Sequence, residues 1–77
     1  MNTPIKYKFI TVGINPDFAE WKGKPAYTVI NNKSTQELAR IIWYPLWRRY
    51  IVQFNPNSIW SDDCLADIQD ALAKAEG

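Results

Sequence analysis

The stretch between Ala39 and Phe54 limits the possible folds more than any other part of this sequence. It consists of two runs rich in β-branched and aromatic residues on either side of Pro45-Leu46. Such runs around a turn predict two antiparallel strands, over residues 36–44 and 47–54, that form a hairpin. The remaining elements can be placed against this hairpin.

Pairing of the two strands assigns the hairpin side chains to two faces, because opposite residues in an antiparallel pair share a face. We expect Tyr44 to lie opposite Trp47; a four-residue loop closed by Trp43 and Arg48 keeps the same parity. The first face is the better candidate for a core and carries Ala39, Ile41, Trp43, Arg48, Tyr50, Val52 and Phe54. The second face carries Arg40, Ile42, Tyr44, Trp47, Arg49, Ile51 and Gln53. We expect the guanidinium of Arg48 to lie over the indole of Trp43, a contact worth about 0.5–1 kcal/mol when exposed.

The second face is too apolar for an ordinary solvated surface and too charged for a core. Arginine, tryptophan and tyrosine are the residues most enriched at the energetic centres of protein interfaces. The predicted binding residues are Arg40, Ile42, Tyr44, Trp47, Arg49 and Ile51. A protein partner or self-association as a homodimer is the leading hypothesis, and the chain is 47% hydrophobic and 14% aromatic, more than one small core easily hides.

Two alternatives to protein binding stay open for this face. The same residue types suit single-stranded nucleic acid, whose bases stack on aromatic rings while its phosphates meet arginines. Two features count against that alternative: the net charge is only +1, and lysines are not concentrated near this face. The other alternative is structural, with Phe18 and Trp21 folding back over the face to make a second small core.

Two further strands are predicted before the hairpin. Residues 5–12 begin with apolar residues alternating with lysine, which predicts a half-buried strand with Ile5, Tyr7 and Phe9 pointing inward and Gly13 at its end. Residues 14–25 contain two prolines and predict a loop or a short helical turn.

The other predicted strand covers residues 26–31, and its register depends on the length of the polar turn that follows. A five-residue loop places Tyr27 and Val29 on the core face, whereas a four-residue loop places Ala26, Thr28 and Ile30 there. We prefer the five-residue loop because it buries more apolar surface.

A helix is predicted over residues 62–75. Ser61 is a good N-cap, and Asp62 and Asp63 suit the positive end of the helix dipole. One arc of the helix carries the apolar residues Cys64, Leu65, Ile68, Ala71, Leu72 and Ala75. This stripe is expected to pack on the first hairpin face, so truncation of either Leu65 or Ile68 to alanine should cost about 2–5 kcal/mol.

These elements predict an α+β fold, a small antiparallel sheet of three to four strands with one C-terminal helix packed on one face. A length of 77 residues predicts a single domain, of a size that buries only about 60% of the surface that its unfolded chain exposes. No apolar run approaches the ~20 residues of a membrane span. The single cysteine fits a reducing compartment, so we expect a cytoplasmic protein that does not bind membranes.

The residues for catalysis are largely missing, so we expect a protein that is not an enzyme and binds no metal or cofactor. The sequence contains no histidine, which is the commonest general base and metal ligand. Cys64 could be a nucleophile near the helix N-terminus, but its place on the apolar stripe favours a buried structural thiol. The acidic residues of the helix lack the spacing of a calcium loop and are more simply a solvated face.

Two motifs resemble a group of small bacterial and phage proteins. They are Ile41-x-Trp43-Tyr44-x-x-Trp47-Arg48-x-Tyr50 and Cys64-Leu65-x-Asp67-Ile68. The resemblance covers roughly residues 27–72, and it implies a bacterial or phage origin without supplying catalytic residues or an activity. This sequence differs from the group in having Ala39 near a usual glycine and Ser34-Thr35-Gln36-Glu37 where an acidic or glycine-containing turn is usual.

Overall fold

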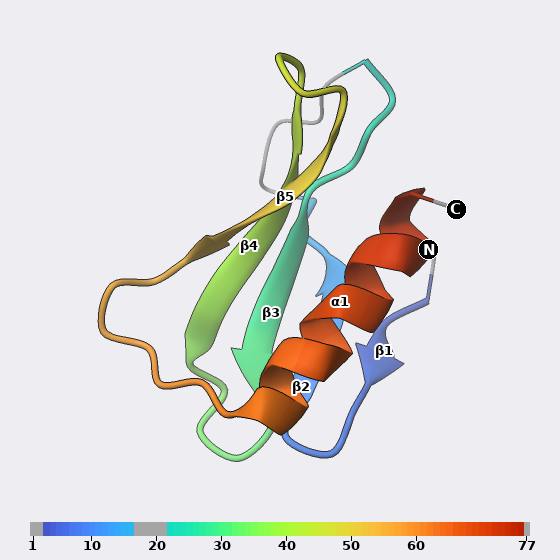
Figure 1. Cartoon of the computed structure of the whole chain (residues 1–77). Coiled ribbons are helices and arrows are strands. Elements are labelled where there is room, and N and C mark those ends of the chain that lie inside the picture. Colours follow the sequence, from blue (N-terminus) through green and yellow to red (C-terminus); the bar gives the residue numbers. More distant parts are fainter. Residues whose placement is uncertain (1–2, 17–21, 77) are drawn as a thin grey trace.

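The computed structural model of the chain describes residues 3–16 and 22–76. In this part the protein is an α+β structure, with five antiparallel strands in the order β1-β2-β3-β4-β5 and one C-terminal helix. The elements are β1 (Ile5–Lys6), β2 (Ile10–Ile14), β3 (Tyr27–Asn31), β4 (Glu37–Tyr44), β5 (Arg49–Phe54) and α1 (Asp62–Glu76). The helix crosses in front of the sheet (Figure 1). The fold class is confirmed, but there are five strands in place of the predicted three to four.

The additional strand arises because the predicted strand 5–12 is two strands. The chain reverses at Tyr7, whose N–H donates to the carbonyl of Ile10 over 2.8 Å. The expected inward position of Phe9 is therefore wrong: its side chain is 45% exposed, and Ile10 is buried instead. Gly13 does not end the strand, because β2 continues to Ile14.

The register of β3 follows the preferred alternative. Residues 32–36 form a five-residue connection, and the side chains of Tyr27 and Val29 are 2% and 0% exposed. Thr35 takes a left-handed backbone conformation with φ 61° in this connection. The predicted helical turn with Phe18 and Trp21 lies outside the described residues.

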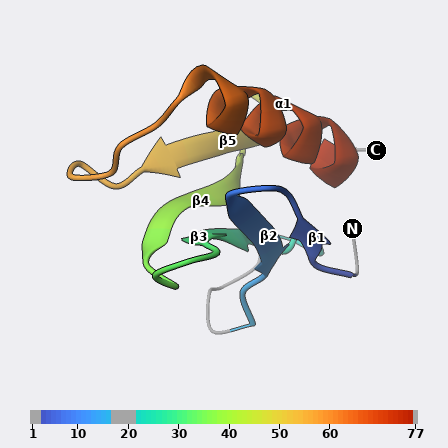
Figure 2. The ribbon, with the colours of Figure 1, turned by 90° about the horizontal axis from the view of Figure 1, so that it is seen from below.

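The sheet is strongly curved at β4. The pairing shifts between Val29 and Ile30, whose partners are Ala39 and Glu37, so Leu38 is the extra residue of a β-bulge. Bulges bend strands and place consecutive side chains unusually, and here Leu38 and Ala39 are both buried. As a result β5 lies at the level of α1, while β1, β2 and β3 lie on the other side of the core (Figure 2).

The core occupies the space between the curved sheet and the helix. Its buried members are Ile10, Val12, Tyr27, Val29, Leu38, Ala39, Ile41, Tyr50, Ile68 and Ala71. Each partly buried member of the helix stripe, Cys64, Leu72 and Ala75, packs against this cluster. The helix therefore covers the predicted hairpin face. The single helix in the described part of the chain is not long and apolar enough to cross a membrane.

Leu65 is the exception on the helix stripe. Its side chain is 46% exposed, so the expectation that it points into the core is wrong. It lines a groove next to β5 together with Val52 and Phe54.

Candidate functional site

The hairpin turn has four residues, Pro45 to Arg48, and is closed by the pair Tyr44 and Arg49. The N–H of Trp47 donates to the carbonyl of Tyr44 over 3.2 Å, and Arg48 has φ 51°. A two-residue hairpin turn requires a positive φ at its first residue, which the ring of proline does not permit. Both predicted pairings, Tyr44 with Trp47 and Trp43 with Arg48, are therefore wrong.

The assignment of side chains to the two faces of the hairpin is nevertheless unchanged, because the observed register differs from the predicted one by two residues. Arg40 pairs with Gln53, Ile42 with Ile51, and Tyr44 with Arg49. These six side chains share the face of the hairpin that points away from α1. Trp47 and Arg48 lie in the turn, so β5 begins at Arg49 and not at residue 47.

The structure brings five of the six predicted binding residues onto one strand face and places the sixth at its end. We call this set, Arg40, Ile42, Tyr44, Trp47, Arg49 and Ile51, the hairpin face. Ile42, Tyr44 and Ile51 are half-buried, whereas Arg49 is exposed. The ring of Trp47 stands edge-on to the ring of Tyr44, with centroids 5.0 Å apart and an interplanar angle of 81°.

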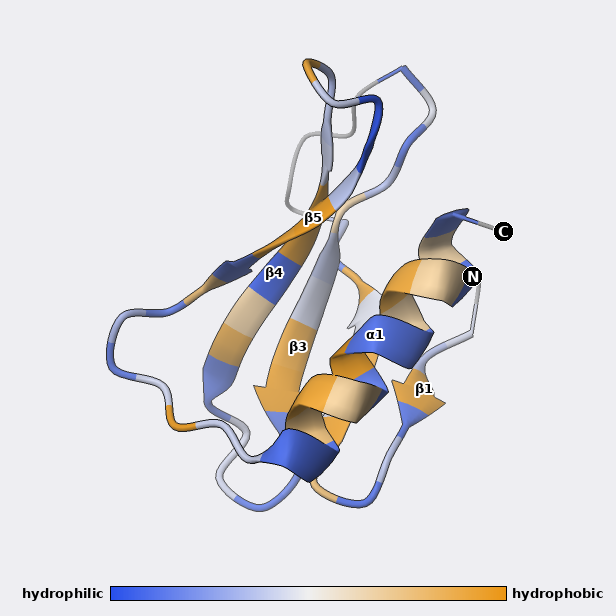
Figure 3. Cartoon of the chain, viewed as in Figure 1, coloured by the Kyte–Doolittle hydropathy of each residue, from blue (hydrophilic) through white to orange (hydrophobic). Residues whose placement is uncertain are grey.

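The tip of the hairpin is the most apolar exposed part of this site. The side chains of Leu46 and Trp47 are 81% and 67% exposed. An apolar segment at the tip stands out against polar neighbours (Figure 3). Sequence reasoning missed Leu46, although a large apolar residue directly after a turn proline was a usable signal, since turns rarely bury their side chains.

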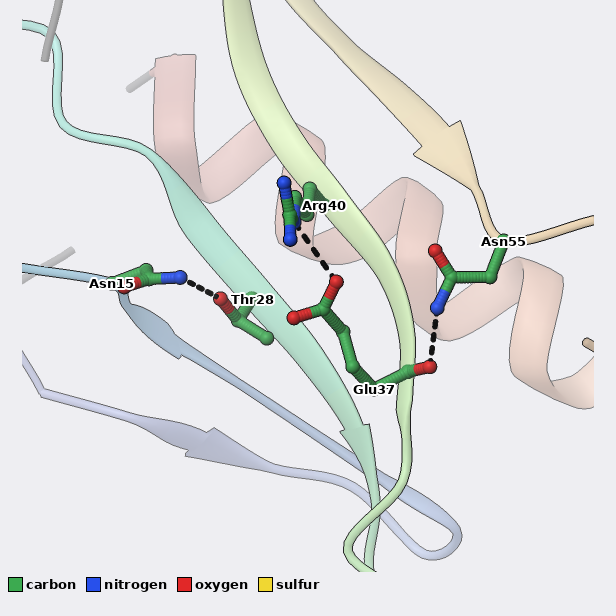
Figure 4. A network of polar contacts seen from close by, with 5 residues as sticks. All are labelled: Asn15, Thr28, Glu37, Arg40 and Asn55. Atoms are coloured by element: carbon green, nitrogen blue, oxygen red, sulfur yellow. Dashed lines mark hydrogen bonds and ion pairs between the residues drawn. The ribbon is translucent and has the colours of Figure 1, made fainter. Parts of the chain in front are cut away.

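The end of the hairpin face far from the turn is polar and partly neutralised. The Nε of Arg40 donates to Oε1 of Glu37 over 2.8 Å. The side-chain amide of Asn55 donates to the carbonyl of Glu37, and that of Asn15 donates to the hydroxyl of Thr28 (Figure 4). Arg40 therefore contributes less positive charge than its sequence position suggests, and the cationic character of the face concentrates near the turn.

The opposite hairpin face has a cation–π contact, but with a different cation from the one predicted. The ammonium group of Lys24 lies 4.7 Å from the ring centroid of Trp43. Arg48 is in the turn and is replaced in this role by a residue distant in sequence. The ring of Trp43 also packs edge-on against Tyr50, with centroids 5.4 Å apart.

A second polar cluster ties the helix to the β1–β2 turn. The hydroxyl of Tyr7 donates to Asp70 over 2.7 Å, and Lys74 forms an ion pair with the same carboxylate over 2.8 Å. Burial and the hydrogen bond to Asp70 raise the pKa of Tyr7 well above its ordinary value. The bonds from Lys74 and Tyr7 lower the pKa of Asp70. These groups stabilise one another in a structural contact on the surface.

The described residues contain no cluster of three or more cysteine, aspartate or glutamate side chains that could hold a metal ion. Cys64 has a free, half-buried thiol, and its backbone N–H donates the N-cap bond to Oγ of Ser61 over 3.3 Å. The exposed side chains of the hairpin face offer apolar contact, ring stacking and positive charge, which is binding chemistry.

Comparison of this chain with protein-family models, with curated proteins and with solved structures gave no match.

Proposed function

We propose that this protein is a small non-enzymatic binding protein that acts on a protein partner through the hairpin face. The observation that carries the proposal is the exposed pair Leu46 and Trp47 at the tip of the β4–β5 hairpin. An apolar tip held on two paired strands can enter a partner's pocket without first having to order itself, so little conformational entropy is lost on binding.

The other residues of the hairpin face can support and surround such an apolar anchor. Tyr44 supports the ring of Trp47 from one side. The exposed side chain of Arg49 follows the turn and can bond to carboxylates or carbonyls at the rim of the interface. This arrangement of an aromatic anchor next to an arginine is typical of interface hot spots.

The resemblance to small bacterial and phage proteins extends the proposal to an inhibitor or accessory factor of phage or mobile-element origin. Its partner would then be a host or phage protein in the cytoplasm, a compartment that the single cysteine favours. The lack of any histidine in the sequence supports a role without catalysis.

Binding to single-stranded nucleic acid is the second candidate, favoured by the exposed Trp47 next to Arg48 and Arg49. The ion pair of Arg40 with Glu37 weakens this candidate, because it takes up part of the positive charge needed for phosphates. Salt dependence separates the two: affinity for nucleic acid should fall steeply with added salt, whereas affinity of an apolar tip for a protein should change little.

Trp47→Ala tests the proposal. We expect affinity for the partner to fall by roughly 2 kcal/mol or more. The free energy of unfolding should change little, because the ring is 67% exposed. The partner is first isolated by pull-down from bacterial lysate with and without nuclease, and the variant is then compared with the parent by calorimetry.

Gln53→Ala is a matched control, since Gln53 is an exposed residue at the far end of the same face. Sedimentation across concentrations shows whether the partner is a second copy. A Trp47→Ala protein that loses stability and keeps its full affinity would contradict the proposal.

A further inference from the structure

A groove runs between strand β5 and helix α1, on the opposite side of the hairpin from the hairpin face. Its volume is about 490 Å³, within the usual range of about 300–1,000 Å³ for binding sites. It is lined by Val52, Phe54, Asp62, Leu65, Ala66, Ile68, Gln69 and Leu72. The side chains of Phe54 and Leu65 are each 46% exposed, so this groove holds apolar surface that the chain's own core does not cover.

Strand β5 offers backbone groups along this groove. In the described sheet β5 lies at the end of the strand order and pairs with β4. The N–H of Asn55 donates to Leu38 on β4, whereas the N–H of Tyr50 donates to Oε1 of Glu76 on α1. Hydrogen bonding alternates along an antiparallel strand, so the backbone groups of Val52 and Phe54 point away from β4, like those of Tyr50.

Only a short part of the β5 edge can therefore accept a new strand, and a carboxylate lies at each end of it. Glu76 already satisfies the N–H of Tyr50 at one end. Asp62, at the N-terminus of α1, lies in the groove near Phe54 at the other. Tyr50 and Phe54 are four residues apart, a span of about 13 Å in an extended chain. Carboxylates mark both ends of this span.

The negative charge of α1 indicates which kind of protein segment can bind in the groove. Among its acidic residues, Asp62 lines the groove and Glu76 accepts a hydrogen bond from the backbone of β5. A second copy that paired its β5 edge with this one would bring two such helices together, and like charges would repel. A segment with basic residues would instead meet the carboxylates at both ends.

We propose that this groove binds an extended, basic segment of a partner protein, which adds to the sheet as a strand next to β5. Its main chain pairs with the outward backbone groups of Val52 and Phe54, as in other cases of strand addition. Every second side chain enters the groove, so an apolar residue at the centre packs on Val52 and Leu65. Lysine or arginine two residues to either side meets Glu76 and Asp62. The site is separate from the hairpin face and does not depend on it.

Synthetic peptides test the proposal directly. The probe is a seven-residue peptide with capped ends that has lysine at positions 2 and 6, valine at position 4 and threonine elsewhere. We expect it to bind with at least tenfold higher affinity than the same peptide with glutamate at positions 2 and 6. In the ¹⁵N spectrum of the full chain, its addition should shift the amide signals of Val52, Phe54, Leu65 and Gln69. Methylation of a backbone nitrogen that pairs with β5 should abolish binding, because it removes a donor.

Two arginine substitutions show whether the peptide binds in the groove or elsewhere on β5. Gln69→Arg places a positive charge in the groove on an exposed helix residue, and we expect at least a tenfold loss of affinity for the lysine peptide. Gln53→Arg is the matched control, because it makes the same change on β5 but on the face away from the groove; its affinity should equal that of the parent. Circular dichroism and thermal unfolding verify that both variants are folded.

Several results would overturn the proposal. These are equal binding of the lysine and glutamate peptides, signal shifts confined to residues 44–49, and undiminished binding by the Gln69→Arg variant. A dimer that forms through the groove in sedimentation, and is broken by Gln69→Arg, would assign the groove to a second copy instead. Trp47→Ala should leave peptide binding unchanged, so failure of this proposal and failure of the proposed function give different results.

Discussion

The two sides of helix α1 differ in how completely the sheet covers them. On the side that faces the core, Ile68 and Ala71 are 3% and 0% exposed and belong to the same cluster as Ile10 and Val12. On the side next to β5, Leu65 is 46% exposed and lines an open groove. One apolar stripe thus serves two purposes: part of it stabilises the fold, and part remains available for contact with another molecule.

Ile68→Ala should have the largest effect on stability. Ile68 is buried in the core cluster, and removing its side chain leaves a cavity in addition to losing apolar burial. We expect a loss of about 2–5 kcal/mol in the free energy of unfolding. Urea denaturation followed by tryptophan fluorescence measures it. A variant as stable as the parent would show that the closed side of the helix does not hold the fold together.

Leu65→Ala should cost less, about 1 kcal/mol, because nearly half of its side chain is already in contact with solvent. The same denaturation experiment compares it with Ile68→Ala. The ratio of the two losses in unfolding free energy is the sharpest test of this difference between the two sides of the helix. Sequence periodicity alone predicts that the two variants lose the same amount. Equal losses would mean that the groove is closed in solution.

Ser61→Ala should also cost about 1 kcal/mol, through loss of the N-cap bond to the N–H of Cys64. This bond fixes where the helix begins and therefore where Leu65 lies relative to β5. Helical content by circular dichroism should fall slightly at the same time. Ser61→Asp, which can accept the same bond, serves as the control and should restore the stability of the parent.

The smallest effect is expected from Asp70, at the flank of α1 that contacts the β1–β2 turn. Its pKa in the folded protein is lowered by Lys74 and Tyr7. A carboxyl group whose pKa is lowered by folding stabilises the folded state above its unfolded pKa, about 3.9, and loses this contribution as pH falls through the folded value. Unfolding measured between pH 6 and pH 2 should show a shallower decline for Asp70→Asn than for the parent. Identical pH profiles would show that this contact adds nothing.

Much of the candidate site could be predicted from the sequence because parity along a strand is a local property. Alternating residues share a face whichever register a hairpin adopts, provided that it shifts by an even number of residues. The grouping of Arg40, Ile42, Tyr44, Arg49 and Ile51 therefore survived an incorrect choice of cross-strand partners. Trp47 did not stay in the strand, because Pro45 excludes the two-residue turn that would have placed it there.

The sequence by itself determined the local elements: the face of each hairpin strand, the N-cap at Ser61 and the acidic first turn of α1. These depend on a residue and its near neighbours. The split of β1 from β2 was decided by the tertiary structure, because the side chain of Asn32, from another turn, donates to the carbonyl of Tyr7 and so fixes the reversal. The open groove was decided in the same way. Helical periodicity reports which residues of α1 are apolar, but the bulge at Leu38 curves the sheet and thereby sets how much of that stripe the strands can cover.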